Sequence, residues 1–187
     1  QTIPYLPDWP ELAAGHGAAA FSLADALQNG NSIAVIGQPG CGKSVMLASL
    51  ASRLCSKDPS LGKLNQHIPI YLHILDLQLE LPENRDPLPA FFKAITPHVA
   101  VIYQSQLTRL ILERLRENTA ILILDGLDEL HPSILVQASS YLKALREKFP
   151  HLQIAAAASP YTLDGLISLG LVPLGVAAWG PAKREEF

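Results

Sequence analysis

Charge is scarce in this sequence, and the charges present form no basic cluster. Of the 187 residues, 17% are charged, and 14 Lys and Arg against 17 Asp and Glu give a formal net charge of −3. A protein that holds nucleic acid through its phosphates needs a concentrated basic surface. The composition therefore indicates no nucleic-acid partner.

Cysteines and long apolar runs are also rare. Cys41 and Cys55 are too few for a disulfide framework or a cysteine metal site. No apolar stretch reaches the roughly 18 residues of a membrane-spanning helix. The six histidines show no pair with the spacing of metal ligands. We therefore expect no membrane span, and the two free thiols favour a reducing, cytoplasmic location.

Neither end of the sequence resembles a natural terminus. The chain begins at Gln1 without a leader-like segment, and it ends in a charged run over residues 183–187. We expect a fragment of a longer protein. Apolar residues make up 49% of the chain, which fits either surface covered by missing domains or a core rich in Leu and Ala around buried parallel strands.

Residues 37–44, GQPGCGKS, match the phosphate-binding loop pattern G-x-x-x-x-G-K-[ST] (Walker A) at every fixed position. An apolar strand over residues 32–36 precedes the loop, and a helix-forming run over residues 45–54 follows it. Glycines let several backbone N–H groups turn toward an anion, and the helix adds the positive end of its dipole. The residues predicted to bind nucleotide are Gly37, Gln38, Pro39, Gly40, Cys41, Gly42, Lys43, Ser44 and Val45.

Two of these side chains have more specific expected roles. Lys43 is predicted to reach the β- and γ-phosphates as a catalytic residue, and the Ser44 hydroxyl is predicted to ligate Mg²⁺.

Predicted strands alternate with predicted helices along the chain, which indicates an α/β fold with a parallel sheet and helices on both faces. Pro69 favours an edge position for the second strand because proline cannot donate to a strand ladder. We expect an irregular lead-in over residues 1–10. The strands are expected over residues 33–36, 67–77, 120–124, 152–158 and 171–178. The helices are expected over residues 11–28, 44–56, 91–99, 104–117, 133–149 and 163–168.

A second acidic motif lies at residues 121–129, ILILDGLDE. Asp125 emerges at the carboxyl end of a buried strand, where open α/β sheets place their ligands, and can hold magnesium, directly or through water, opposite Ser44. Gly126 is expected to leave room beside the metal. Asp128 and Glu129 follow as catalytic candidates that orient or deprotonate a water molecule. Which of the two is the base stays open, as does the alternative that these acids only cap the next helix.

This acidic segment resembles the extended Walker B motif of NACHT-type NTPases, which belong to the signal-transduction (STAND) branch of the AAA+-related P-loop ATPases. In that group a small residue follows the magnesium aspartate and further acids come just downstream, as Gly126, Asp128 and Glu129 do. The resemblance implies a three-layer P-loop NTPase sandwich whose five-stranded parallel sheet has the order 5-1-4-3-2. It divides the chain into an N-terminal lead-in and helix (1–30), an NTPase core (31–180) and the start of a missing C-terminal lid (181–187).

One position departs from this pattern. Such proteins often carry a Thr-Ser-Arg-Pro-like sensor of the γ-phosphate after the fourth strand, whereas this chain has AASP at residues 157–160. Ser159 therefore stands where the arginine would be. Its hydroxyl can contact a phosphate or a water molecule but brings no charge. We keep Ser159 as a catalytic candidate and expect slow hydrolysis.

The resemblance implies an ATP- and ADP-binding switch that needs Mg²⁺, hydrolyses ATP slowly and self-associates through the full-length protein. The sequence lacks the Asn-Lys-x-Asp motif of guanine-specific GTPases. Two alternatives remain: a nucleotide-binding module that does not hydrolyse, and a phosphotransferase in which Asp128 activates a substrate hydroxyl. For the second, residues 80–90 offer only Arg85 as a phosphate clamp.

Two other groups of side chains allow more than one interpretation. Arg109, Arg114 and Arg116 lie on one predicted helix and would form either an arginine finger for a neighbouring subunit or a solvated helix face. Tyr5, Pro7 and Trp9 would either wrap an adenine or pack the lead-in.

Overall fold

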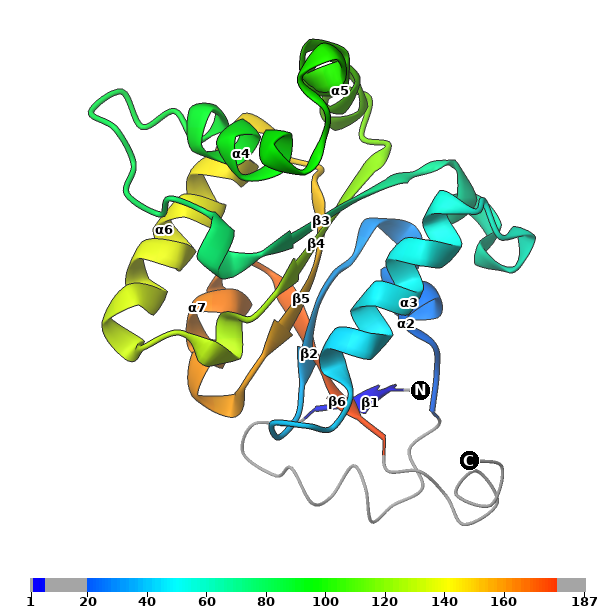
Figure 1. Cartoon of the computed structure of the whole chain (residues 1–187). Coiled ribbons are helices and arrows are strands. Elements are labelled where there is room, and N and C mark those ends of the chain that lie inside the picture. The colour runs from blue at the N-terminus through cyan, green and yellow to red at the C-terminus, as the bar shows by residue number, and fades with distance from the viewer. Residues whose placement is uncertain (1, 6–19, 178–187) are drawn as a thin grey trace.

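In a computed structural model of the chain, which describes residues 2–5 and 20–177, a central sheet is covered by helices on both faces (Figure 1). The strands are β1 (Thr2–Pro4), β2 (Ser32–Ile36), β3 (Ile68–His73), β4 (Ala120–Asp125), β5 (Gln153–Ala158) and β6 (Leu171–Val176). The helices are α2 (Leu23–Leu27), α3 (Lys43–Cys55), α4 (Leu88–Ile95), α5 (Val101–Arg116), α6 (Pro132–Lys148) and α7 (Leu163–Ser168).

Six strands in the described residues form one sheet in the order β1-β6-β2-β5-β4-β3. The five from β6 to β3 are parallel and follow the order 5-1-4-3-2 that the resemblance implied. Pro69 lies in β3, which is an edge strand as expected. The expectation of a purely parallel five-stranded sheet was wrong, because β1 pairs antiparallel with β6. A strand of three residues with Pro4 in it carries almost no signal of its own, and it forms because the edge of β6 offers it partners.

Alternate residues of the central strands enter two separate apolar layers. In β4, Ile121 and Ile123 pack with α2 and α3, whereas Leu122 and Leu124 pack with the helices α4 to α7. This alternation follows from the two-residue period of a strand, and burial on both faces explains the nearly continuous apolar sequence. By the same alternation, Asp125 falls on the α3 face.

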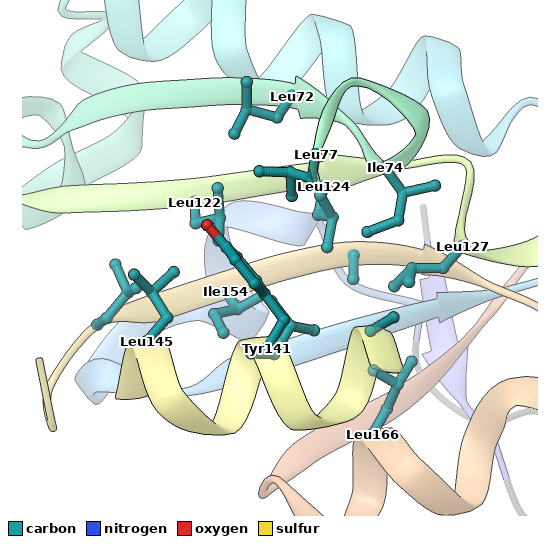
Figure 2. Close-up of a cluster of buried hydrophobic side chains, with 14 of the residues drawn as sticks. Leu72, Ile74, Leu77, Leu122, Leu124, Leu127, Tyr141, Leu145, Ile154 and Leu166 are labelled. Atoms are coloured by element: carbon teal, nitrogen blue, oxygen red, sulfur yellow. The ribbon is translucent and has the colours of Figure 1, made fainter. Parts of the chain in front are cut away.

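Tyr141 of α6 shows how tightly the second layer is closed. Its ring is fully buried beside Leu122 and Ile154 (Figure 2). Its hydroxyl donates to the Pro87 carbonyl oxygen at 2.7 Å, and Lys148 pairs with Asp86 at 2.8 Å. These two contacts attach the long connection between β3 and α4 to α6.

Two element boundaries differ from expectation for local reasons. Helix α2 begins only at Leu23, because Ser22 caps it and exchanges hydrogen bonds with Asp25, while Phe21 pairs with Thr2. The predicted helix over residues 11–28 is therefore wrong at residues 20–22, and residues 11–19 lie outside the described ones. The predicted strand over residues 67–77 ends at His73, whose Nδ1 accepts the Leu75 N–H of a 3-10 turn at Ile74–Asp76.

The remaining predicted helices and strands lie within a few residues of the observed ones. Within the described residues, none of the helices combines the length and apolar character needed to cross a bilayer.

Candidate functional site

The candidate site lies where the parallel strands end, because the carboxyl ends of β2, β4 and β5 share one edge of the sheet. After β2 the chain makes the loop of residues 37–42 and enters α3 at Lys43. Gly42, at the start of this helix, has φ 94°, a left-handed conformation that favours glycine. Asp125, the last residue of β4, lies opposite this loop. The sequence motifs at residues 37–44 and 125–129 thus meet in space.

Lys43 is held inside the loop that it follows. The side chain is only 5% exposed, and Nζ lies 3.0 Å from Asp128 Oδ2. Nζ also donates to the carbonyl oxygens of Gly37 at 2.8 Å and Gln38 at 3.1 Å. The Asp128 carboxylate therefore offsets the free-energy cost of burying the Lys43 ammonium group.

Asp125 is a buried carboxylate, 7% exposed, whose oxygens accept three hydrogen bonds from the part of the chain that the structure describes. Oδ1 accepts from the Ser44 hydroxyl at 3.1 Å and from the Gly126 N–H at 3.0 Å. Oδ2 accepts from the Tyr71 hydroxyl at 2.8 Å. Partial burial of Tyr71, together with the Asp125 carboxylate, raises the pKa of the phenol to about 12. Tyr71 therefore keeps its proton at neutral pH and donates a hydrogen bond to Asp125.

The two acids that the sequence left undecided diverge in the structure. Both belong to the 3-10 turn Leu127–Glu129, which the buried Leu127 anchors in the core. Asp128 is 16% exposed and points to Lys43, whereas Glu129 is 59% exposed and lies 3.6 Å from His73 Nε2. Asp128 is therefore the acid at the phosphate-binding loop, and Glu129 lies toward the β3 edge.

The space at Gly126, which was expected to be left open beside the metal, is occupied by the His73 ring. Gly126 has φ 81°, and a Cβ added there would overlap two atoms of that ring and contact a third tightly. The glycine is required both by its backbone conformation and by this close approach.

Replacing Gly126 with alanine is therefore expected to destabilise the fold. The left-handed backbone alone costs about 1–2 kcal/mol for a residue with a Cβ, which corresponds to a melting temperature lower by about 2–8 °C in a domain of this size. Displacing the His73 ring adds to this cost. Thermal unfolding followed by circular dichroism measures the effect.

Gly30→Ala is the matched control, because Gly30 has φ 82° and a Cβ added there would meet no heavy atom of the described residues within 4 Å. Gly126→Ala should cost more than Gly30→Ala, and His73→Ala in the same chain should remove the excess. Equal costs for the two single alanine variants would contradict a steric role of His73.

Ser159 follows β5 between the two motifs but is engaged in a local turn. Its N–H donates to Thr162 Oγ1 at 3.0 Å, and Thr162 Oγ1 donates to its carbonyl oxygen at 2.9 Å. Within the described residues, no hydrogen bond joins Ser159 to Lys43, Asp125 or Asp128. Ser159 thus lies at the same end of the sheet as the candidate site, but its hydrogen bonds are made to Thr162 and not to the site residues.

The other loop residues form the outer surface of the candidate site. Gln38, Pro39, Gly40 and Val45 are exposed, and Cys41 is a half-buried free thiol. The Cys41 sulfur packs so closely on Gly37 that a Cβ there would overlap it. The arginines of α5 lie outside this site: Arg109 pairs with Glu113 of the same helix, and Arg114 pairs with Glu117, the residue that caps it.

Sequence reasoning missed Tyr71 and His73. Both lie on β3, whose register places Tyr71 opposite Ile123 and His73 opposite Asp125. The signal was available in part, because residues 71 and 73 alternate with the apolar residues 70, 72 and 74. A polar face on the strand beside Asp125 could have been proposed from that alternation once the strand order was assumed.

The strand order, the glycine loop that opens α3 and the acid at the end of β4 define an α/β P-loop NTPase-like domain. The family model described as NACHT domain matches residues 31–168, and the chain belongs to that family. Membership of this NTPase-like family implies nucleotide binding. A search of curated proteins finds no significant match.

Two solved structures are similar to the chain at low sequence identity. The replication initiator DnaA bound to AMPPCP and single-stranded DNA shares 18% identity at a TM-score of 0.44, with 86% of this chain and 45% of that chain covered. PCH-2 of C. elegans shares 13% identity at a TM-score of 0.43, with 96% of this chain and 43% of that chain covered. The chain thus spans less than half the length of each of these proteins.

Proposed function

We propose that this NACHT domain binds ATP and ADP with Mg²⁺, works as a nucleotide-dependent switch and hydrolyses ATP slowly. The observation that carries the proposal is the convergence of Lys43, Ser44, Asp125 and Asp128, from two segments about 80 residues apart, at one edge of the sheet. A loop of backbone N–H groups with a lysine and a neighbouring acid pair is suited to phosphate and its metal.

The donor set fits magnesium. Ser44 Oγ and Asp125 Oδ1 are oxygen atoms 3.1 Å apart, and Mg²⁺ prefers oxygen ligands, with one or two protein groups completed by water and phosphate oxygens. The described residues contain no group of three His, Cys, Asp or Glu that would bind a metal without nucleotide. Bound Mg²⁺ would offset charge on the β- and γ-phosphates, with Ser44 as the direct ligand and Asp125 behind it.

The Lys43–Asp128 pair suggests how a triphosphate changes the site. Lys43 cannot contact a γ-phosphate in full while it is held by Asp128 and two loop carbonyls. Triphosphate therefore competes with Asp128 for the lysine, and the released carboxylate is free to orient a water molecule. A diphosphate competes less because it lacks the γ-phosphate, which gives the two nucleotides different effects on the acidic turn.

The proposal is tested by the nucleotide that purified protein carries. Freshly purified protein is denatured, the supernatant is separated by ion-exchange chromatography, and ATP binding with Mg²⁺ is titrated on nucleotide-free protein. We expect ADP in the released material and ATP binding that GTP does not displace at equal concentration. Absence of both released nucleotide and Mg²⁺-ATP binding would overturn the proposal.

Ser159 favours one alternative, a nucleotide-binding module without hydrolysis, because the sensor position carries no charge. Intact ATP in the released material would support that alternative over the slow ATPase. A phosphotransferase would require an acceptor, so phosphate release without any acceptor would exclude it.

The other parts of the functional hypothesis concern the whole protein. We propose self-association of the full-length protein and a cytoplasmic location on the family resemblance and the free thiols. Residues 178–187, which contain the predicted start of the C-terminal lid, lie outside the described residues, as do residues 6–19 with Trp9.

A further inference from the structure

We propose that Tyr71 is a positioning residue of the magnesium site, acting through Asp125. The inference rests on the proposed function, because it assigns a task to a side chain beside the metal residues. Tyr71 would set the orientation of the Asp125 carboxylate and, through it, of the Ser44 hydroxyl.

The hydrogen bonds divide the two oxygens of Asp125 between different neighbours. Oδ1 receives the hydroxyl of Ser44 and the N–H of Gly126, both from the side of the phosphate-binding loop and the acidic turn. Oδ2 receives only the Tyr71 hydroxyl among the described residues, at 2.8 Å. Tyr71 is thus the contact that holds the second oxygen and prevents the carboxylate plane from turning.

Only a long side chain can make this contact from position 71. The register pairs Tyr71 with Ile123 and places Asp125 two residues further along β4. Such diagonal neighbours have Cα atoms roughly 7–8 Å apart, within reach of an aromatic side chain but not of a short polar one. The residue directly opposite Asp125 is His73, whose ring is already occupied against Gly126 and near Glu129.

The orientation matters for the metal because the Ser44 hydroxyl keeps its proton and directs it at Asp125 in a hydrogen bond. With that proton directed at Oδ1, the lone pairs of the Ser44 oxygen are directed away from Asp125 and are available to a cation. A carboxylate that turned would accept the proton in another direction and move those lone pairs. Removing a hydrogen bond that orients a metal ligand typically lowers metal affinity by about 10- to 100-fold.

A simpler interpretation is that Tyr71 is an edge-strand tyrosine that covers the sheet. Tyr71 is 41% exposed, which is compatible with such a covering role. That role needs the ring alone, whereas the proposed role needs the hydroxyl. The Tyr71→Phe variant separates the two because it keeps the ring and removes only the oxygen.

The experiment measures ATP affinity on the whole chain over a series of Mg²⁺ concentrations and in EDTA. The proteins are wild type, Tyr71→Phe, Asp125→Asn as the variant that should lose the magnesium effect, and Tyr103→Phe. Tyr103 is an exposed tyrosine on α5 and undergoes the same chemical change away from the site. Mn²⁺ binding to the nucleotide-loaded proteins, followed by electron paramagnetic resonance, gives a direct second readout.

We expect Tyr71→Phe to raise the Mg²⁺ concentration for half-maximal effect, and to weaken Mn²⁺ binding, by about 10-fold. Its ATP affinity in EDTA and its melting temperature should match those of Tyr103→Phe. An unchanged metal dependence in Tyr71→Phe would overturn the inference while leaving the proposed function intact. A loss of affinity that is equal with and without metal would also overturn it, since the hydroxyl would then act on the nucleotide itself. Wild-type protein that binds no ATP would overturn both.

Discussion

Lys43→Ala is expected to reduce ATP affinity by about 100-fold or more while the domain remains folded. A hydrogen bond to a charged group contributes about 1.5–3 kcal/mol, which is roughly 10- to 100-fold in affinity for each one lost. The lysine is proposed to contact two phosphates. Isothermal titration with Mg²⁺-ATP measures the loss, and circular dichroism checks the fold.

The structure identifies a complication in this variant and a way around it. Removing Lys43 leaves the carboxylate of Asp128 without its 3.0 Å partner, and an uncompensated, largely buried charge destabilises a fold. The double variant Lys43→Ala/Asp128→Asn removes both charges. It should recover most of the stability that the single variant loses, but none of the ATP affinity.

Lys63→Ala serves as the control, because Lys63 is an exposed lysine in the 3-10 segment Pro59–Gln66. It should bind ATP as wild type does. ATP affinity within a factor of two of wild type in the well-folded double variant would contradict the assignment of Lys43 to the phosphates.

Asp128→Asn is expected to slow ATP hydrolysis by about 100-fold or more, whereas Glu129→Gln should change it only a few-fold. A positioned general base typically contributes about 10²- to 10⁴-fold. Both substitutions keep the shape of the side chain and remove one charge, so they are a matched pair. They differ in place: Asp128 contacts Lys43, and Glu129 is mostly exposed beside His73.

The affinity of Asp128→Asn distinguishes this role from a general loss of structure. Without the Asp128 charge, Lys43 is released for phosphate, so ATP should bind as tightly as to wild type or more tightly. Single-turnover phosphate release and ATP titration on the same preparations give both quantities. A larger loss of turnover in Glu129→Gln than in Asp128→Asn would assign the base to Glu129 instead.

The parts of the fold that sequence reasoning anticipated are those whose evidence is contiguous in the chain. Four apolar residues before Asp125 indicate a buried strand whatever lies beside it, and β4 is indeed buried along its whole length. The helix after the phosphate-binding loop was likewise expected within one residue of α3. Strand β1 was missed, because three residues with a proline form a strand only when another edge pairs with them.

The sequence by itself determined the local patterns: an anion-binding loop at the start of a helix, an acid at the end of a buried strand, and the alternation that makes a parallel sheet. Tertiary structure decided which side chains meet. Tyr71 donates a hydrogen bond to Asp125, which lies 54 residues away in the sequence. Lys43 pairs with Asp128 and not with Glu129. The His73 ring fills the space at Gly126. These contacts depend on strand order, on register and on the direction of each side chain from the backbone. A one-residue change of register would turn Tyr71 and His73 to the opposite face of the sheet.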